Sequence, residues 1–179
     1  DSAKTSVVLS LDSFSTEDIV EQFTYDKTVL DNILDLDTSF LPSINGYDKY
    51  FIYNLSSTST KEALVLIKNT DSTFEEDYIE VLDALGFVYN TRQQSYILED
   101  NDYTLVIQVK YDISYNAAFL YMRKYNAGEI IPVLRKTMRS VLESDSAVYM
   151  EFMLEKITKE APDLKNIILD VTWNTGGNV

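Results

Sequence analysis

Several short stretches between residues 46 and 125 have the pattern of β-strands. In the clearest one, residues 103–111, Leu105, Ile107 and Val109 alternate with Thr104, Gln108 and Lys110. This alternation places the apolar side chains on one face of a strand. Further strand-like stretches are residues 47–55, 63–68, 87–89, 95–98 and 117–124. The order of strands, one helix and then a meander predicts an α+β fold in which a helix covers one face of an antiparallel sheet.

The helix inside this region is predicted over residues 73–85. It begins at Thr73-Phe-Glu-Glu76, which has the spacing of a capping box. Gly86 follows at the position where helices often end in a left-handed residue. The run Leu85-Gly86-Phe87 is also similar to the terminus-binding loop of PDZ domains. We interpret it as a helix C-cap, because its glycine follows a helix rather than preceding a binding strand.

The residues before this region predict a strand and two helices. The strand covers residues 5–11, and the first helix begins at Ser15, with Ile19, Val20 and Phe23 on its apolar side. The second helix covers residues 26–37, and its aspartates at 31, 35 and 37 are interpreted as a solvated face. They lack the alternate spacing, turn glycine and terminal Glu of a calcium loop, so no metal site is predicted. A turn-rich segment at residues 41–46 marks a boundary.

The residues after the sheet predict two more helices, over residues 129–142 and from Ser144 to Ala161. They lead into a buried strand at residues 167–169. We therefore predict three parts, residues 1–45, 46–125 and 126–179, the last being the truncated start of an α/β core.

Composition excludes several functional classes. The chain has no cysteine and no histidine, which excludes a Ser-His-Asp triad, thiol nucleophiles, disulfides and imidazole metal ligands in these residues. Its net charge of −14 makes nucleic acid an improbable partner. No apolar stretch is long enough to span a bilayer, and the first residues lack the apolar region of a signal peptide. No cofactor is predicted, and the composition suits an extracytoplasmic protein.

The last fourteen residues carry the main functional signal. The apolar run Ile167-Ile-Leu169 predicts a buried strand, and Asp170 follows it directly. Asn174-Thr-Gly176-Gly177 comes next, and its two glycines allow a backbone N–H to approach a bound group closely. A buried strand that runs into such a loop is a common way to place amides at an α/β site.

This string resembles the signature of the S41 serine peptidases, the family of C-terminal processing or tail-specific proteases. That family has an apolar strand ending in Asp-Leu-Arg and then Asn-x-Gly-Gly, whereas Thr172 stands here in place of the usual Arg. The resemblance implies hydrolysis of a polypeptide substrate by a Ser-Lys dyad. It also implies that Gly176 or Gly177 supplies one oxyanion donor.

The nucleophile implied by the resemblance lies downstream of the Gly-Gly loop in that family. Ser140, Ser144 and Ser146 lie upstream and are interpreted as surface or capping residues. The chain is therefore expected to be the inactive amino-terminal part of such a peptidase, with the acidic region 46–125 as an accessory module. One alternative is a non-catalytic binding or surface-interaction domain. Another alternative is a nucleotide-binding protein in which Asp170, at the end of the strand, binds magnesium. The chain has no glycine-rich phosphate-binding loop to support it.

Overall fold

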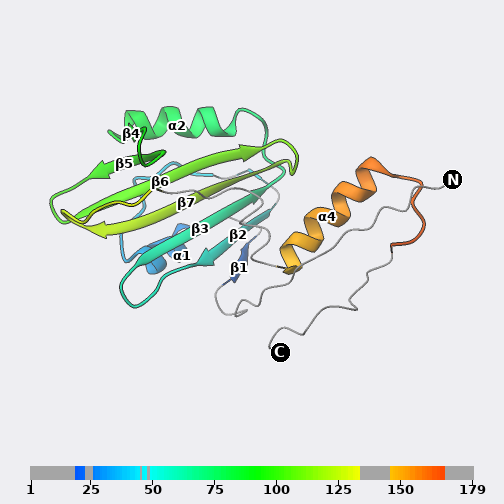
Figure 1. Cartoon of the computed structure of the whole chain (residues 1–179), viewed down its shortest axis with the longest axis horizontal. Coiled ribbons are helices and arrows are strands. Elements are labelled where there is room, and N and C mark those ends of the chain that lie inside the picture. Colours follow the sequence, from blue (N-terminus) through cyan, green and yellow to red (C-terminus); the bar gives the residue numbers. More distant parts are fainter. Residues whose placement is uncertain (1–18, 23–25, 45, 48, 134–145, 168–179) are drawn as a thin grey trace. The chain divides into compact units, whose positions relative to one another are not determined.

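The computed structural model describes residues 19–22, 26–44, 46–47, 49–133 and 146–167 (Figure 1). Chain contacts divide the protein into two compact units, residues 15–138 and residues 1–14 with 139–179. The described part of the first unit is a sheet with two helices. The described part of the second unit is one helix and the segment that follows it.

A seven-stranded antiparallel sheet forms the first unit, in the order β1-β2-β3-β7-β6-β5-β4. The chain therefore builds one meander from β1 to β3, crosses to the far edge, and returns through a second meander that ends between β3 and β6. This confirms the predicted α+β class. The strands are β1 (Ile19–Gln22), β2 (Lys49–Asn54), β3 (Lys61–Lys68), β4 (Val88–Asn90), β5 (Ser95–Glu99), β6 (Tyr103–Asp112) and β7 (Ala117–Asn126).

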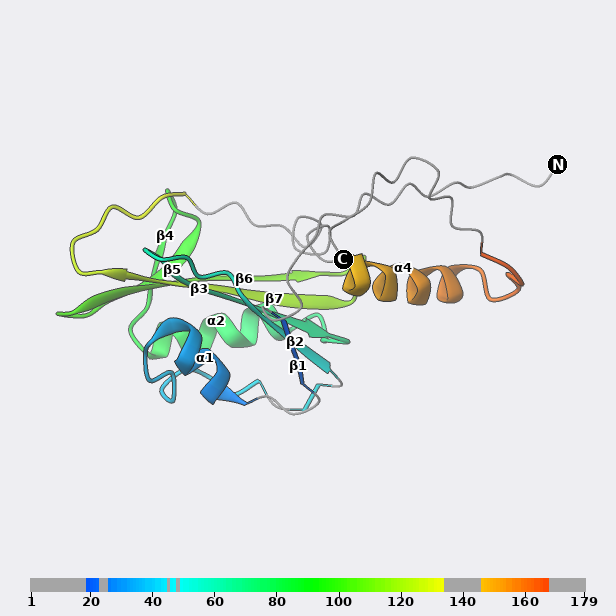
Figure 2. The ribbon, with the colours of Figure 1, turned by 90° about the horizontal axis from the view of Figure 1, so that it is seen from below.

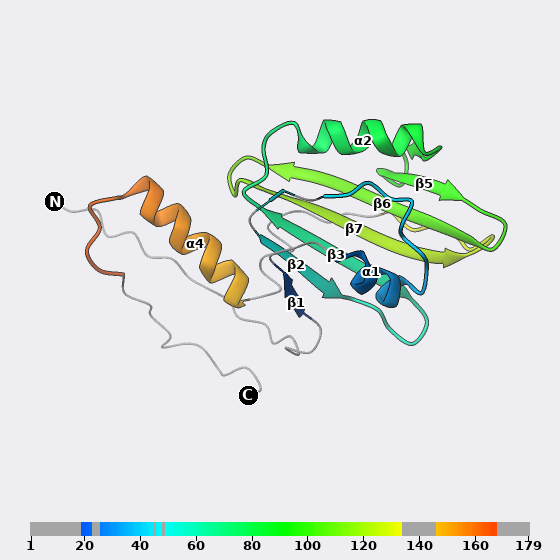
Figure 3. The same ribbon diagram turned by 180° about the vertical axis from the view of Figure 1, so that it is seen from behind.

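Two helices, α1 (Lys27–Leu34) and α2 (Phe74–Ala84), cover the same face of the sheet (Figures 2 and 3). Leu34 from α1 and Leu82 from α2 are fully buried in one core with Val65 of β3 and Leu120 of β7. Helix α1 thus shares its core with strands on the other side of the predicted boundary at residue 45.

The opposite face of the sheet is also buried at its centre. Leu66, Val106 and Phe119 lie on it, as do the polar Thr104 and Gln108, which are 6% and 5% exposed. Burial on both faces explains the continuous apolar run at residues 63–67, since no position in such a strand needs to face water.

Two predicted helices are wrong where the structure describes them. Residues 19–22 form strand β1, paired with β2, instead of continuing a helix from Ser15. The β-branched pair Ile19-Val20 favours a strand, and pairing with β2 is a long-range interaction that local capping signals do not report. Residues 129–133 are not helical, because the residue before Pro132 is pushed away from α conformation. Residues 134–142 lie outside the described part.

The ends of helix α2 test two predicted caps. Gly86 has φ +89°, and the N–H of Phe87 donates to the Leu82 carbonyl at 3.0 Å, which confirms the C-cap. The capping box is wrong, because the Thr73 side chain makes no cap hydrogen bond. Its hydroxyl oxygen instead lies 2.9 Å from the carboxylate of Asp71 and 2.7 Å from that of Asp77, and its single O–H donates to one of the two.

The second unit contains helix α4 (Ser146–Glu160), which ends before Pro162 as predicted. Val148 and Phe152 are its buried apolar residues. Among the residues that the structure describes, no helix is long and apolar enough to cross a membrane.

Candidate functional site

The residues of the predicted peptidase motif are almost all outside the described part of the chain. This applies to Gly176, Gly177 and Asp170, and also to Ser140 and Ser144. Ser146 is the first residue of helix α4. Ile167, the first residue of the predicted strand, is described; it lies outside any strand and is 46% exposed.

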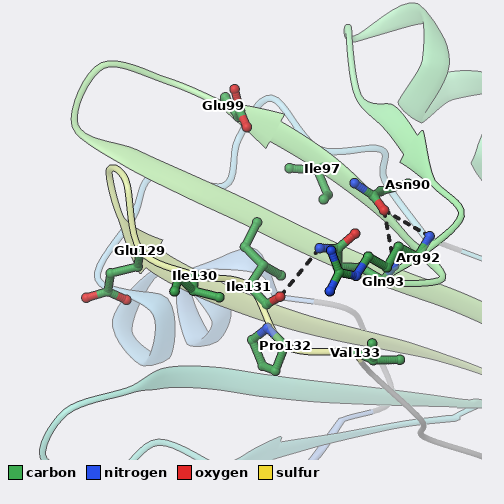
Figure 4. Close-up of a pocket in the computed structure, with 10 residues that line it drawn as sticks. All are labelled: Asn90, Arg92, Gln93, Ile97, Glu99, Glu129, Ile130, Ile131, Pro132 and Val133. Atoms are coloured by element: carbon green, nitrogen blue, oxygen red, sulfur yellow. Dashed lines mark hydrogen bonds between the residues drawn. The ribbon is translucent and has the colours of Figure 1, made fainter.

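A cavity of about 490 Å³ lies on the first unit, on the sheet face opposite the two helices (Figure 4). One wall is the β4–β5 hairpin, and the other is the segment 129–133 that follows β7. We call this cavity the hairpin groove. The hairpin residues that line it are Asn90, Arg92, Gln93, Ile97 and Glu99.

The hairpin loop is held by the side chain of Asn90. Its Oδ1 accepts from the backbone N–H groups of Arg92 and Gln93, at 3.0 and 3.1 Å. The N–H of Gln94 donates to the Asn90 carbonyl at 2.8 Å, and Gln94 has φ +55°. These bonds form a tight turn that fixes Arg92 and Gln93 at the end of the groove.

The segment 129–133 is positioned by a turn after β7. Gly128 has φ +79°, which glycine adopts at little cost, and the Asn126 side-chain amide donates to the Glu129 carboxylate. Farther along, the side-chain amide of Gln93 donates to the Ile131 carbonyl at 3.5 Å. A contact between residues 38 positions apart therefore closes one end of the groove.

Two polar atoms of the hairpin are buried without a hydrogen-bond partner. They are Oε1 of Gln93 and Oγ of Ser95, the latter in a residue that is 1% exposed. Ser95, Ile97 and Glu99 share the groove face by strand alternation. Since buried polar atoms nearly always have a partner, a water molecule or another donor would complete these two; such atoms also occur outside the hairpin, for example Oγ of Thr70.

Exposed apolar side chains gather around the same hairpin. Val88 is 68% exposed, Ile130 is 94% exposed and Val133 is 42% exposed. Tyr89, at 49% exposed, packs against Tyr96 across the hairpin, with the rings tilted by 48° and their centroids 5.0 Å apart. The charged groups at the groove are Glu99, Glu129 and Arg92, so carboxylates outnumber cations.

A second polar cluster lies on the same sheet face, on β3 and β7. Arg123 pairs with Glu62 at 3.6 Å and lies over the Tyr125 ring, 4.7 Å from its centroid. Burial, and then a hydrogen bond to Glu62, raise the pKa of Tyr121 well above its ordinary value. Burial also raises the pKa of Tyr125. The tyrosines therefore stay neutral, and this cluster offers no free base; we interpret it as structural.

Two of the three aspartates at positions 31, 35 and 37 accept hydrogen bonds from nearby residues. Asp31 Oδ1 accepts from the N–H and hydroxyl of Thr38, at 2.7 and 2.6 Å. Asp37 Oδ1 accepts from the Ser39 N–H at 2.9 Å. Within the described ranges, no three acidic side chains are grouped so that they could hold a metal ion.

Comparisons with protein-family models, with curated proteins and with solved structures gave no match to this chain. Sequence reasoning missed the hairpin groove because its two walls are separated by some thirty residues and one wall was predicted as a helix. The Ile131-Pro132 pair was the available signal for an extended segment.

Proposed function

We propose that this chain is the non-catalytic, substrate-handling part of an S41-type serine peptidase, and that residues 15–138 bind polypeptide. The observation that carries the binding role is the hairpin groove, an open cavity with unsatisfied buried acceptors beside a sheet edge. The peptidase assignment is supported by the string from Ile168 to Gly177. An extracytoplasmic location is part of the same proposal.

The two roles fit together physically. A polypeptide held on one unit has a raised effective concentration at a site carried by the same protein. In this proposal the loop at Gly176 and Gly177 donates one backbone N–H to the oxyanion of the peptide bond under attack. The serine nucleophile and lysine base would come from residues after Val179.

The test compares chain 1–179 with the protein encoded by the complete gene, using fluorescently labelled casein. The complete protein should hydrolyse casein and chain 1–179 should not. Gly176→Pro and Gly177→Pro each remove one backbone N–H. The variant that loses the oxyanion donor should lower turnover about 10²–10³-fold, while Asn178→Ala should not. Hydrolysis by chain 1–179, or unchanged turnover in both proline variants, would overturn the peptidase assignment.

A stand-alone binding or surface-interaction domain is the second candidate. It is favoured by the position of Ile167, which is exposed and outside any strand, unlike an interior residue of a peptidase core. The two candidates separate in the same experiment. A complete protein that binds unfolded casein but never cleaves it would support the second.

A further inference from the structure

We propose that an extended polypeptide segment pairs with the outer edge of β4 and places alternate side chains in the hairpin groove. This inference rests on the proposed polypeptide-binding function and names its site and binding mode. The segment would add an eighth strand to the sheet beside β4. Every second side chain of the segment would face the groove, and these side chains would be apolar and cationic in turn.

The backbone of β4 provides the first argument. β4 is the last strand of the sheet, and in the part of the chain that the structure describes no strand pairs with its outer side. An edge strand presents unpaired N–H and C=O groups, which only another extended chain matches in spacing. Natural edges are usually protected by Lys, Pro or a bulge. β4 reads Val88-Tyr89-Asn90 and pairs with β5 without a bulge, so it has neither Lys, Pro nor a bulge, and its length of three residues is the protection that it does have.

The side chains beside the edge provide the second argument. Val88 pairs with Ile97 and Asn90 pairs with Ser95, and all four lie on the groove face. Tyr89 and Tyr96 lie on the opposite face. An added strand would alternate in the same way, so every second side chain would point toward the groove. An apolar side chain would contact Val88 and Ile97, which are apolar.

The unsatisfied acceptor of Gln93 provides the third argument. Its amide nitrogen is held by the Ile131 carbonyl, which leaves Oε1 buried without a donor. Because this oxygen has almost no exposed surface, the Gln93 side chain would have to turn toward the groove to accept from an N–H or ammonium group of a bound segment. Glu99 and Glu129 then favour a cation at the same face of the segment.

The net charge of the chain favours a cationic peptide over a second copy of the chain as the occupant of the groove. A second copy of the chain would bring another net charge of −14. Like charges of this size oppose self-association at low salt. A cationic peptide has no such penalty, and it is therefore the occupant that the observations favour.

The test uses chain 1–179 and a fluorescein-labelled peptide, acetyl-Lys-Thr-Val-Thr-Lys-Thr-Val-Thr-amide, followed by fluorescence anisotropy. Two control peptides carry Glu in place of Lys, or N-methyl groups at alternate residues, which block strand pairing. Only the unmodified Lys peptide should bind well. The double variant Glu99→Lys with Glu129→Lys should weaken its binding about tenfold and should strengthen binding of the Glu peptide. Glu76→Lys is the matched control. It reverses an exposed charge on helix α2 and should change binding little.

Amide hydrogen exchange locates the bound peptide. Exchange should slow in residues 88–90 when the Lys peptide is added, and should not change in residues 19–22 at the other edge. If the peptide binds without protection at 88–90 and without a response to the double variant, this inference is wrong while polypeptide binding stands. If neither the peptide nor unfolded casein binds, both fail. Protection of 88–90 that depends on protein concentration alone would identify a second copy and overturn the inference.

Discussion

The carboxylate of Glu75 accepts a hydrogen bond from the backbone N–H of Tyr111, at 2.9 Å, and so joins helix α2 to the end of strand β6. The other oxygen of Glu75 pairs with Lys110, also at 2.9 Å. The two residues of the first contact are 36 positions apart. The bond therefore anchors the crossover helix to the second meander of the sheet.

Glu75→Ala should destabilise the sheet unit by about 1.5–3 kcal/mol, the range for hydrogen bonds that involve a charged group. Lys110→Ala should cost less than about 1 kcal/mol, because Lys110 is half exposed and surface ion pairs contribute little. Urea unfolding followed by circular dichroism measures both. Glu76→Ala, the exposed neighbour on α2, is the control. Equal effects of the Glu75 and Glu76 variants would show that the Tyr111 bond adds nothing.

Backbone conformation predicts stability changes of opposite sign at Gly86 and Gln94. Gly86 has φ +89° with nothing within 4 Å of an added Cβ, so Gly86→Ala should cost about 1 kcal/mol through conformation alone. Gln94 has φ +55° and carries a side chain, so Gln94→Gly should stabilise by several tenths of a kcal/mol or more. Thermal unfolding midpoints should move down and up, respectively. Shifts in the same direction would contradict this interpretation.

Buried tyrosines predict a loss of stability in alkali. The pKa of Tyr121 is raised in the folded chain by burial and by its hydrogen bond to Glu62, so folding favours the neutral phenol. Its contribution is complete below the unfolded pKa of about 10 and is lost as the pH rises above that value. Tyr121→Phe should flatten the fall of the unfolding midpoint between about pH 9 and 11. Absorbance at 295 nm should show one fewer late-ionising tyrosine.

The N-cap of helix α1 predicts a loss of stability in acid. Hydrogen bonds from Thr28, first from its backbone N–H at 2.9 Å, lower the pKa of Asp26 in the folded chain. The stabilisation is present above the unfolded pKa of about 3.9 and is lost as the pH falls through the folded value. Asp26→Asn keeps an N-cap acceptor without a titrating group. Melting curves from pH 6 to 3 should therefore fall less steeply in this variant, and identical slopes would argue against the cap as the cause.

The sequence predicted the centre of the fold well because its signals there are local. Alternation in β6, the apolar run of β3 and the glycine after α2 all act within a few residues. The failure at residues 19–22 arises because a long-range contact, pairing with β2, places this segment. At residues 129–133 the Ile131-Pro132 pair was a local signal against a helix, but the contact with Gln93 that holds the segment beside the hairpin is long-range. The hairpin groove could not be predicted for the same reason. Gly176 and Gly177 remain predictions, because they lie outside the described residues.

The sheet order has a consequence for how the chain folds. Strands β3 and β7 pair in the middle of the sheet although their partners are about 50–60 residues apart in sequence, while each meander alone has only neighbouring contacts. Such late, non-local pairing slows folding. As the chain leaves the ribosome, the first meander must wait with one side of β3 uncovered until residue 126 is made. We expect this interval to be the period when nascent chains are most prone to aggregate.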